Sequence, residues 1–284
     1  MPKHLAPLSV LCLALAVSPA CLVRRRAVVT PPSRRAGPLL VATKDDLIQR
    51  IHAFQDPIQS FLLRADLTPT VLDRSKAVET DYATIGVDIL FRRPEDIRIL
   101  GLQPLIESTI VDMVSNGKEF RVSIPRKKRF IIGDNDAPET SEHTLENLRP
   151  AAIQTSLLIY PPEPKTELAV LENDTDRALY ILLIVRRKQD QLTPARGIYF
   201  DQHTLQITRQ KTFDSSGAIV SDARYSNWKD YGGISYPSDI EIQRPEENYK
   251  MQLNIVSAKF NQPGVTADKF VLEQPSGTEL QIVK

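Results

Sequence analysis

Residues 114–124, VSNGKEFRVSI, contain the turn that decides the fold class. Asn116 and Gly117 form an Asn-Gly pair between two β-compatible runs, which is the strongest short-range signal for a β-hairpin. The residues after the turn alternate between apolar and polar side chains, and a period of two is typical of a strand with one buried face. The stretch therefore predicts two antiparallel strands, over residues 108–114 and 120–124, joined by a tight turn.

Further β-compatible runs lie before and after this hairpin. The predicted strands cover residues 61–67, 82–91, 96–100, 168–171, 178–187, 197–200, 205–213, 219–225, 234–243, 250–260 and 270–272. Turn-forming residues separate several of these runs, at Asn173-Asp174, Ser216-Gly217, Gly232-Gly233 and Gln262-Pro263-Gly264. Many short strands with few helices predict an α+β protein that is mainly β, built on one large, curved antiparallel sheet.

Two segments have the spacing of amphipathic helices. Thr43 and Asp46 form a variant of a capping box, and apolar residues recur after them at helical intervals, which predicts a helix over residues 44–57. A second helix is predicted over residues 141–159, where serine and threonine caps precede leucines at helical intervals. Pro150 must kink or divide this second helix, because proline has no N–H to donate.

The first residues of the chain have the pattern of an export signal. Residues 1–20 begin with a short charged region, continue with an apolar run over 5–17, and end with the small residues that a signal peptidase requires. Cys21 follows directly, so we expect lipidation of this thiol and a stable anchor made of more than one acyl chain. Two alternatives stay open: simple secretion after signal cleavage, or an uncleaved membrane anchor over residues 5–23.

Residues 21–42 are rich in proline and arginine and lack apolar periodicity, so they predict an extended tether behind the lipidated cysteine. The arginines at 24–26 either attract anionic lipid headgroups, form a solvated linker, or favour the uncleaved anchor by the positive-inside rule. Residues 43–284 are expected to form a single domain. Because Cys12 and Cys21 are the only cysteines, neither a disulfide framework nor a CxxC metal site is expected.

Charge and motif content exclude several classes of function. The chain has 36 Lys and Arg against 35 Asp and Glu, so it has no global field that would attract nucleic acid. The basic run at residues 126–129 is interpreted as a hairpin turn or a charge-protected edge strand. The four histidines are scattered, and there is no HExxH, GxSxG or phosphate-binding loop. We therefore predict no catalytic residue, no metal ligand and no cofactor.

Several phrases, in their order along residues 43–277, resemble the LolA/LolB superfamily of periplasmic lipoprotein-sorting proteins. The phrases are FRRP at 91–94 with IRI at 97–99, VSNGKEF at 114–120, IP at 124–125, IYFD at 198–201 with TL at 204–205, YPSDI at 236–240, YKM at 249–251, NQPG at 261–264, FVL at 270–272 and PSG at 275–277. The resemblance implies an unclosed β-barrel covered by one to three helices, with an apolar concavity that accommodates acyl chains.

Strand alternation supplies candidate residues for the wall of that apolar groove. They are Phe91, Ile99, Phe120, Tyr180, Leu182, Phe200 and Ile240. The alternative for each of them is a dry core that packs against the covering helices. Trp228 lies in an aromatic turn and is expected either to touch a membrane or partner or to cap one end of the barrel.

The resemblance and the predicted anchor together imply a non-enzymatic, lipid-anchored protein at the periplasmic face of the bacterial outer membrane. Such a protein would receive or deliver acylated lipoproteins, with their acyl chains or other lipids as ligands and a lipoprotein carrier as a partner. Anchoring in the inner membrane is the alternative location. An assembly scaffold with a filled interior is the alternative function.

Overall fold

The computed structural model describes residues 37–73, 76–103, 108–135, 149–188 and 191–283. From Gly37 onward the chain forms one compact unit. The predicted signal peptide, Cys21, the arginines at 24–26 and the first part of the predicted second helix lie outside the described residues.

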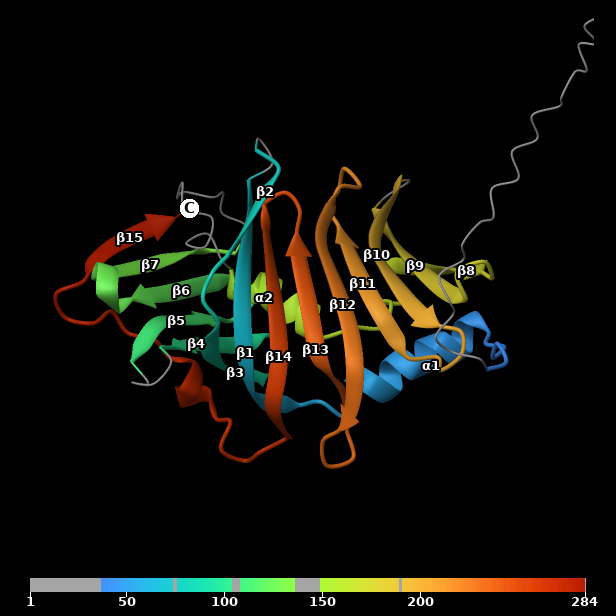
Figure 1. The fold of residues 1–284 in the computed structure, drawn as a ribbon, viewed down its shortest axis with the longest axis horizontal. Helices are drawn as coiled ribbons and strands as arrows, with labels where there is room; N and C mark the ends of the chain where they lie inside the picture. Colours follow the sequence, from blue (N-terminus) through green and yellow to red (C-terminus); the bar gives the residue numbers. More distant parts are fainter. Residues whose placement is uncertain (1–36, 74–75, 104–107, 136–148, 189–190, 284) are drawn as a thin grey trace, which may run out of the picture. The chain divides into compact units, whose positions relative to one another are not determined.

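Fifteen strands of the described body join one sheet (Figure 1). In chain order they are β1 (Ser60–Asp73), β2 (Val78–Asp81), β3 (Ile85–Arg92), β4 (Asp96–Leu102), β5 (Thr109–Ser115), β6 (Glu119–Ile124), β7 (Arg129–Asp134), β8 (Glu167–Asp174), β9 (Leu179–Lys188), β10 (Gln191–Asp201), β11 (Ile207–Phe213), β12 (Ile219–Asp230), β13 (Ser235–Arg244), β14 (Tyr249–Phe260) and β15 (Glu279–Val283).

The order across the sheet is β15-β7-β6-β5-β4-β3-β1-β14-β13-β12-β11-β10-β9-β8, and β2 pairs with β1 beside this path. The described pairs are antiparallel, except that β15 runs parallel to β7. The sheet is curved but does not close, since β15 and β8 are its two ends. The predicted fold class, an unclosed barrel made of one mainly antiparallel sheet, is therefore confirmed.

The hairpin at Asn116 and Gly117 forms as predicted. Ser115 at the end of β5 pairs with Phe120 in β6. The N–H of Asn116 donates to the carbonyl of Glu119 at 3.2 Å, and Gly117 has a φ of 90°. Glycine adopts this left-handed conformation without the steric penalty that a Cβ brings, which explains the Asn-Gly signal.

Alternation gives the sheet an apolar inner face and a charged outer face. In β1 the side chains of Phe61, Leu63, Ala65 and Leu67 are buried, whereas Arg64 between them is exposed. Cross-strand ion pairs run over the outer face, among them Arg64 with Asp88, Arg98 with Asp112 and Arg209 with Asp222. The inner face carries the main hydrophobic core.

Two α-helices lie on the inner face. Helix α1 (Lys44–Gln55) confirms the first predicted helix, including the capping box. Helix α2 (Pro150–Leu157) packs against β4, β5, β12 and β13. Pro150 is its first residue, because Arg149 before it is extended at φ −113° and ψ 124°, as steric conflict with the proline ring requires. The predicted helix therefore does not run unbroken through Pro150, and it ends before the predicted residue 159 because Leu158 is extended.

The prediction of a strand over residues 270–272 is wrong. Phe270 ends a short 3-10 helix, η3 (Ala267–Phe270), and the next residues cross the outer face of the sheet without joining it. Arg98 and Arg121 donate side-chain hydrogen bonds to the carbonyls of Lys269 and Leu272, at 2.9 and 3.3 Å. These bonds to the backbone replace the ladder that a strand would have formed. We call residues 267–272 the C-terminal strap.

The sequence patterns missed three strands, β2, β7 and β15. The basic run does form the predicted hairpin connection: the 3-10 helix η1 (Pro125–Lys127) and Lys128, with φ 49°, link β6 to β7. Asn173 and Asp174, expected in a turn, are the last two residues of β8, and the turn follows them.

Candidate functional site

Helix α1 starts with its own hydrogen-bonded cap. The hydroxyl of Thr43 accepts from the N–H of Asp46 at 3.2 Å, and the Asp46 carboxylate accepts from the N–H of Thr43 at 2.9 Å. These bonds to Thr43 lower the pKa of the Asp46 carboxyl. The helix then buries Leu47, Ile51 and Gln55 against the sheet and leaves its other side exposed.

A hollow opens between the second half of α1 and the sheet. It has a volume of about 270 Å³, close to the lower end of the range of ligand pockets, roughly 300–1,000 Å³. Apolar side chains dominate its wall, and Arg50, Gln206 and Ser235 supply the polar side chains. The apolar members of the lining are Ala53, Phe54, Pro57, Leu205, Ile207, Trp228 and Ile234.

A second hollow of about 490 Å³ lies beside the first half of α1. It shares Arg50, Ala53 and Leu205 with the first hollow, so the two adjoin along the helix. Val41, which is 92% exposed, lines its far end. We call the two hollows together the α1 groove. The second hollow is also lined by Ala42 and by the polar side chains of Asp46 and Gln49, and Arg50 lies at the junction of the two parts.

Aromatic side chains connect the α1 groove with the core of the protein. The ring of Phe54 meets Trp228 edge to face at 5.6 Å and stacks on Tyr236 at 5.8 Å. Tyr236 in turn lies 5.4 Å from Phe260. The indole nitrogen of Trp228 is buried and has no hydrogen-bond partner among the described residues. A buried donor without a partner is costly, so this N–H would gain a hydrogen bond from any polar ligand atom that entered the groove deeply enough to meet it.

The C-terminal end of α1 is fixed by the side chains of Arg93 and Asn261, which directly follow β3 and β14. Arg93 donates to the carbonyls of Ile58 and Gln55, at 2.7 and 2.8 Å. Asn261 donates to the carbonyl of Pro57 at 2.7 Å. These bonds satisfy carbonyls that a helix end leaves without partners. They also fix the position of the helix end that lines the α1 groove.

The end of α2 is held in the same way from the inner face. Gln210, Tyr225 and Tyr236 donate to the carbonyls of Thr155, Ser156 and Leu157, at 2.7, 2.9 and 2.9 Å. Burial raises the pKa of the Tyr225 and Tyr236 hydroxyls. Both tyrosines therefore stay protonated donors well above neutral pH. Tyr236 contacts both helices, since it bonds α2 and stacks on Phe54 of α1.

The fold is similar to that of a LolA superfamily protein from Nitrosomonas europaea, with a TM-score of 0.52 and 13% identity, over 82% of this chain and 99% of that chain. It is also similar to a DUF1329 family protein from Desulfovibrio piger, with a TM-score of 0.51 and 14% identity, over 80% of this chain and 95% of that chain. The described body has a LolA-like fold. By sequence, no family model and no curated protein matches the chain.

All seven residues predicted for the wall of a groove lie on the inner face of this LolA-like fold. Each is at most 5% exposed, and all belong to one core cluster: Phe91, Ile99, Phe120, Tyr180, Leu182, Phe200 and Ile240. The Phe91 ring lies 5.1 Å from Phe61, and the Arg149 guanidinium stacks 4.4 Å from the centre of the Phe120 ring. The hydroxyl of Tyr180 donates to the carbonyl of Leu40 at 3.2 Å.

The α1 groove is lined by other residues than these seven. The helix predicted over residues 44–57 includes Phe54, and Trp228 was expected either to touch a membrane or partner or to cap one end of the barrel, but no sequence pattern brought the two residues together. The signal that could have found them is the aromatic content of residues 225–231 beside the Gly-Gly turn. In the structure, Phe54 of α1 and Trp228 of β12 pack against each other edge to face.

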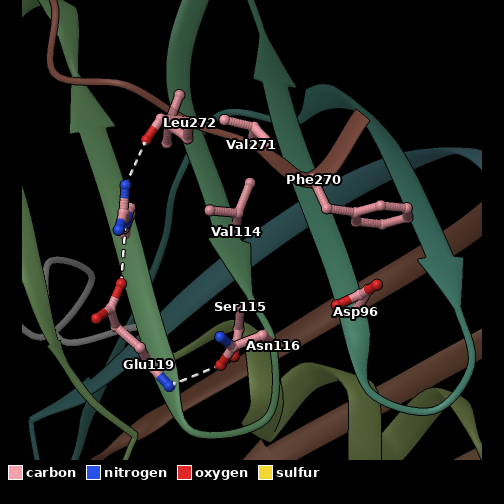
Figure 2. A pocket seen from close by; sticks show the side chains of 9 residues that line it. Asp96, Val114, Ser115, Asn116, Glu119, Phe270, Val271 and Leu272 are labelled. Atoms are coloured by element: carbon pink, nitrogen blue, oxygen red, sulfur yellow. Dashed lines mark hydrogen bonds and ion pairs between the residues drawn. The ribbon is translucent and has the colours of Figure 1, made fainter. Parts of the chain in front are cut away.

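A third hollow, of about 240 Å³, lies on the outer face beneath the C-terminal strap (Figure 2). Its charged side chains include Asp96, Glu119 and Arg121. Arg121 donates to the carboxylate of Glu119 at 2.9 Å and to the carbonyl of Leu272 in the strap at 3.3 Å. This hollow therefore lies inside the packing contact between the strap and the sheet. Fewer apolar residues line it than line the α1 groove.

The described residues contain no group of three or more His, Cys, Asp or Glu side chains that could hold a metal ion. Neither α1 nor α2 has the length and hydropathy of a transmembrane helix.

Proposed function

We propose that this protein binds an acyl chain of a lipoprotein, or of another lipid, in the α1 groove. The observation that carries the proposal is the apolar groove between α1 and the inner face of a LolA-like sheet, which continues into the aromatic residues Phe54, Trp228 and Tyr236. Burial of methylene groups would drive binding, at about 0.8 kcal/mol for each CH₂. Arg50, at the junction of the two parts of the α1 groove and beside the Asp46 carboxylate, is the cationic side chain of the lining that would face an anionic headgroup.

The seven inner-face residues extend this proposal into the body. They belong to the same core cluster as Leu47 and Ile51 of α1, so a longer chain would reach them if the covering helices moved outward. Their present burial, at most 5% each, is also what a scaffold with a filled interior would show. The choice between the two functions therefore depends on whether lipid is found in the body.

The proposal includes the N-terminal region. A signal peptide over residues 1–20 and lipidation at Cys21 would anchor the protein at the periplasmic face of the outer membrane, with residues 21–42 as the tether. Fifteen residues separate Cys21 from Gly37, and an extended chain of this length spans about 50 Å. The body could thus receive an acylated lipoprotein from a carrier and deliver it to the bilayer.

Native mass spectrometry with lipid extraction tests the proposal. The protein is made from residue 24 onward, so that any lipid found must be held by the body and not by Cys21. A stoichiometric lipid is expected in the parent chain. Ala53→Trp, which fills the α1 groove, should abolish it, whereas His52→Trp, on the exposed side of α1, should retain it. A folded parent protein without lipid would contradict acyl binding and favour the scaffold.

A further inference from the structure

The outer face of the sheet carries two apolar zones, one toward each end. Toward the β15 end, Val114, Phe130 and Ile132 face outward, and Leu272 of the C-terminal strap packs over them. Toward the β8 end, an apolar zone of similar kind stays exposed. Its members are Leu168 and Val170 of β8, Ile181, Leu183 and Val185 of β9, and Leu192 of β10, and we call it the outer patch.

Alternation and register place these six side chains on one surface. In β9, Tyr180, Leu182 and Ile184 are buried in the core, so the residues between them face outward. Leu168 pairs with Val185, and Val170 pairs with Leu183. Val170 is 55% exposed and Leu192 is 59% exposed. Ion pairs occupy much of the remaining outer face, so an uncovered apolar area here indicates a contact surface.

Acidic and basic side chains lie at opposite ends of the outer patch, as measured along the strand direction. Glu172, opposite Ile181, lies at one end, followed by Asp176 in the β8–β9 turn. Arg187, opposite Leu192, lies at the other end, followed by Lys188. Within the described part of the chain, neither Glu172 nor Arg187 forms a side-chain ion pair. Arg177, in the same turn as Asp176, is paired with Asp174 at 3.3 Å, so the charge left free at each end of the patch has one sign.

This distribution is self-complementary under a two-fold rotation. When two sheets pack face to face, about 10 Å apart, a two-fold axis between them and perpendicular to the strands reverses the strand direction. The acidic end of one patch then meets the basic end of the other, and apolar side chains meet at the centre. From this pattern we infer that the outer patch binds the outer patch of a second copy of this chain, as an isologous dimer.

The inferred dimer is independent of the proposed lipid binding, because the outer patch and the α1 groove lie on opposite faces of the sheet. Dimerisation would leave both grooves open. It would also leave the C-terminal strap free, since the strap covers the other end of the outer face.

Sedimentation velocity of the full chain over a range of concentrations tests the inference by charge reversal. Arg187→Glu and Glu172→Arg should each raise the dimer dissociation constant by about tenfold, because each reversal makes two ion pairs of the two-fold interface repulsive. The double variant should restore it to within about twofold of the parent, since the two charges exchange ends. The N-terminal region is common to all variants and cannot explain a difference among them.

A second pair of variants tests the apolar centre. Val170→Asp should make the protein monomeric, while Val256→Asp, at a 62% exposed position on β14, should leave the dimer unchanged. A parent chain that stays monomeric at every concentration would overturn the inference, and so would failure of the double charge reversal to restore association. A monomer whose binding to anionic vesicles falls in Val170→Asp would assign the patch to a lipid surface instead.

Discussion

At the residue scale, polar side chains of the sheet cap the C-terminal end of helix α2. Helix α2 ends at Leu157 with an extended residue and no glycine. Its last carbonyls are satisfied by Gln210, Tyr225 and Tyr236, which lie on strands more than fifty residues further along the chain. A helix of eight residues is too short to be stable alone, so these bonds and its packing against the sheet fix it in place.

The first prediction concerns the hydroxyl of Tyr236. In Tyr236→Phe the ring still stacks on Phe54, but the carbonyl of Leu157 loses its buried donor. We expect the free energy of unfolding to fall by about 1–2 kcal/mol in urea titrations. Tyr82→Phe, at a residue 48% exposed, is the control and should change it by less than about 0.5 kcal/mol. Equal effects of the two substitutions would show that the bond to α2 contributes nothing.

Alkaline pH should destabilise the protein through the same tyrosines. Their ordinary pKa is 10.0, and burial raises the pKa of Tyr225 and Tyr236 above it in the folded state. Above pH 10 the unfolded chain therefore binds fewer protons than the folded one, so the free energy of unfolding falls. The expected slope is about 1.4 kcal/mol per pH unit for each tyrosine. Urea titrations between pH 9 and 11 should show a shallower fall in Tyr236→Phe than in the parent; parallel curves would contradict the assignment.

For single residues, the sequence could predict a position on the inner face only where alternation within one strand determines which face the residue occupies. Alternation within a strand is a local property, so Phe91 and Leu182 were correctly expected on the inner face. The wall of the α1 groove comes from three distant segments, around residues 50–57, 205–207 and 228–235. No local pattern shows that these segments meet, because their contact depends on the curvature of the whole sheet.

At the element scale, the strand that closes the β15 end of the sheet depends on a glycine. Gly133 in β7 pairs with Val283 in β15. A Cβ at this position would lie 2.7 Å from the Val283 carbonyl oxygen and 3.0 Å from the Phe120 ring. The first contact is closer than packed atoms allow and involves the backbone, and the second is tighter than most packed contacts.

Gly133→Ala should therefore displace β15 and cost about 1–3 kcal/mol of stability. Hydrogen exchange should show the amides of residues 279–283 losing protection while those of β1 keep it. Gly86→Ala in β3 is the matched control, because nothing lies within 4 Å of its Cβ. Unchanged protection of residues 279–283 in Gly133→Ala would mean that β15 tolerates the added methyl group.

The elements found from sequence are those with a strong local signal. The capping box at Thr43 and the Asn-Gly turn at Asn116 each predicted an element that the structure contains. Strands β7 and β15 were missed for a different reason. The basic run at 126–129 has no apolar alternation, so it did not indicate that β7 starts at Arg129. Strand β15 is a short segment flanked by polar residues, and its only described partner is a strand 150 residues away. Residues 270–272 were mistaken for a strand because an extended strap and a strand have the same apolar composition.

At the scale of the whole molecule, one broad sheet is covered by only two α-helices in the described body. The helices protect part of the inner face, and the strap protects part of the outer face. The α1 groove and the outer patch lie where this cover ends. The sequence predicted the class of fold, because turn residues and alternation add up over many strands, but the position of uncovered surface depends on which segments pack together.

A ligand that binds only the folded state must raise the thermal midpoint of the whole protein. A long-chain fatty acid at about one hundred times its dissociation constant stabilises by about 2.7 kcal/mol. For a domain of this size that corresponds to a rise in Tm of about 5–10 °C. The rise should grow with the logarithm of ligand concentration and should be lost in Ala53→Trp but retained in His52→Trp. If both variants lost it equally, or if Ala53→Trp kept it, the acyl chain would bind somewhere other than the α1 groove.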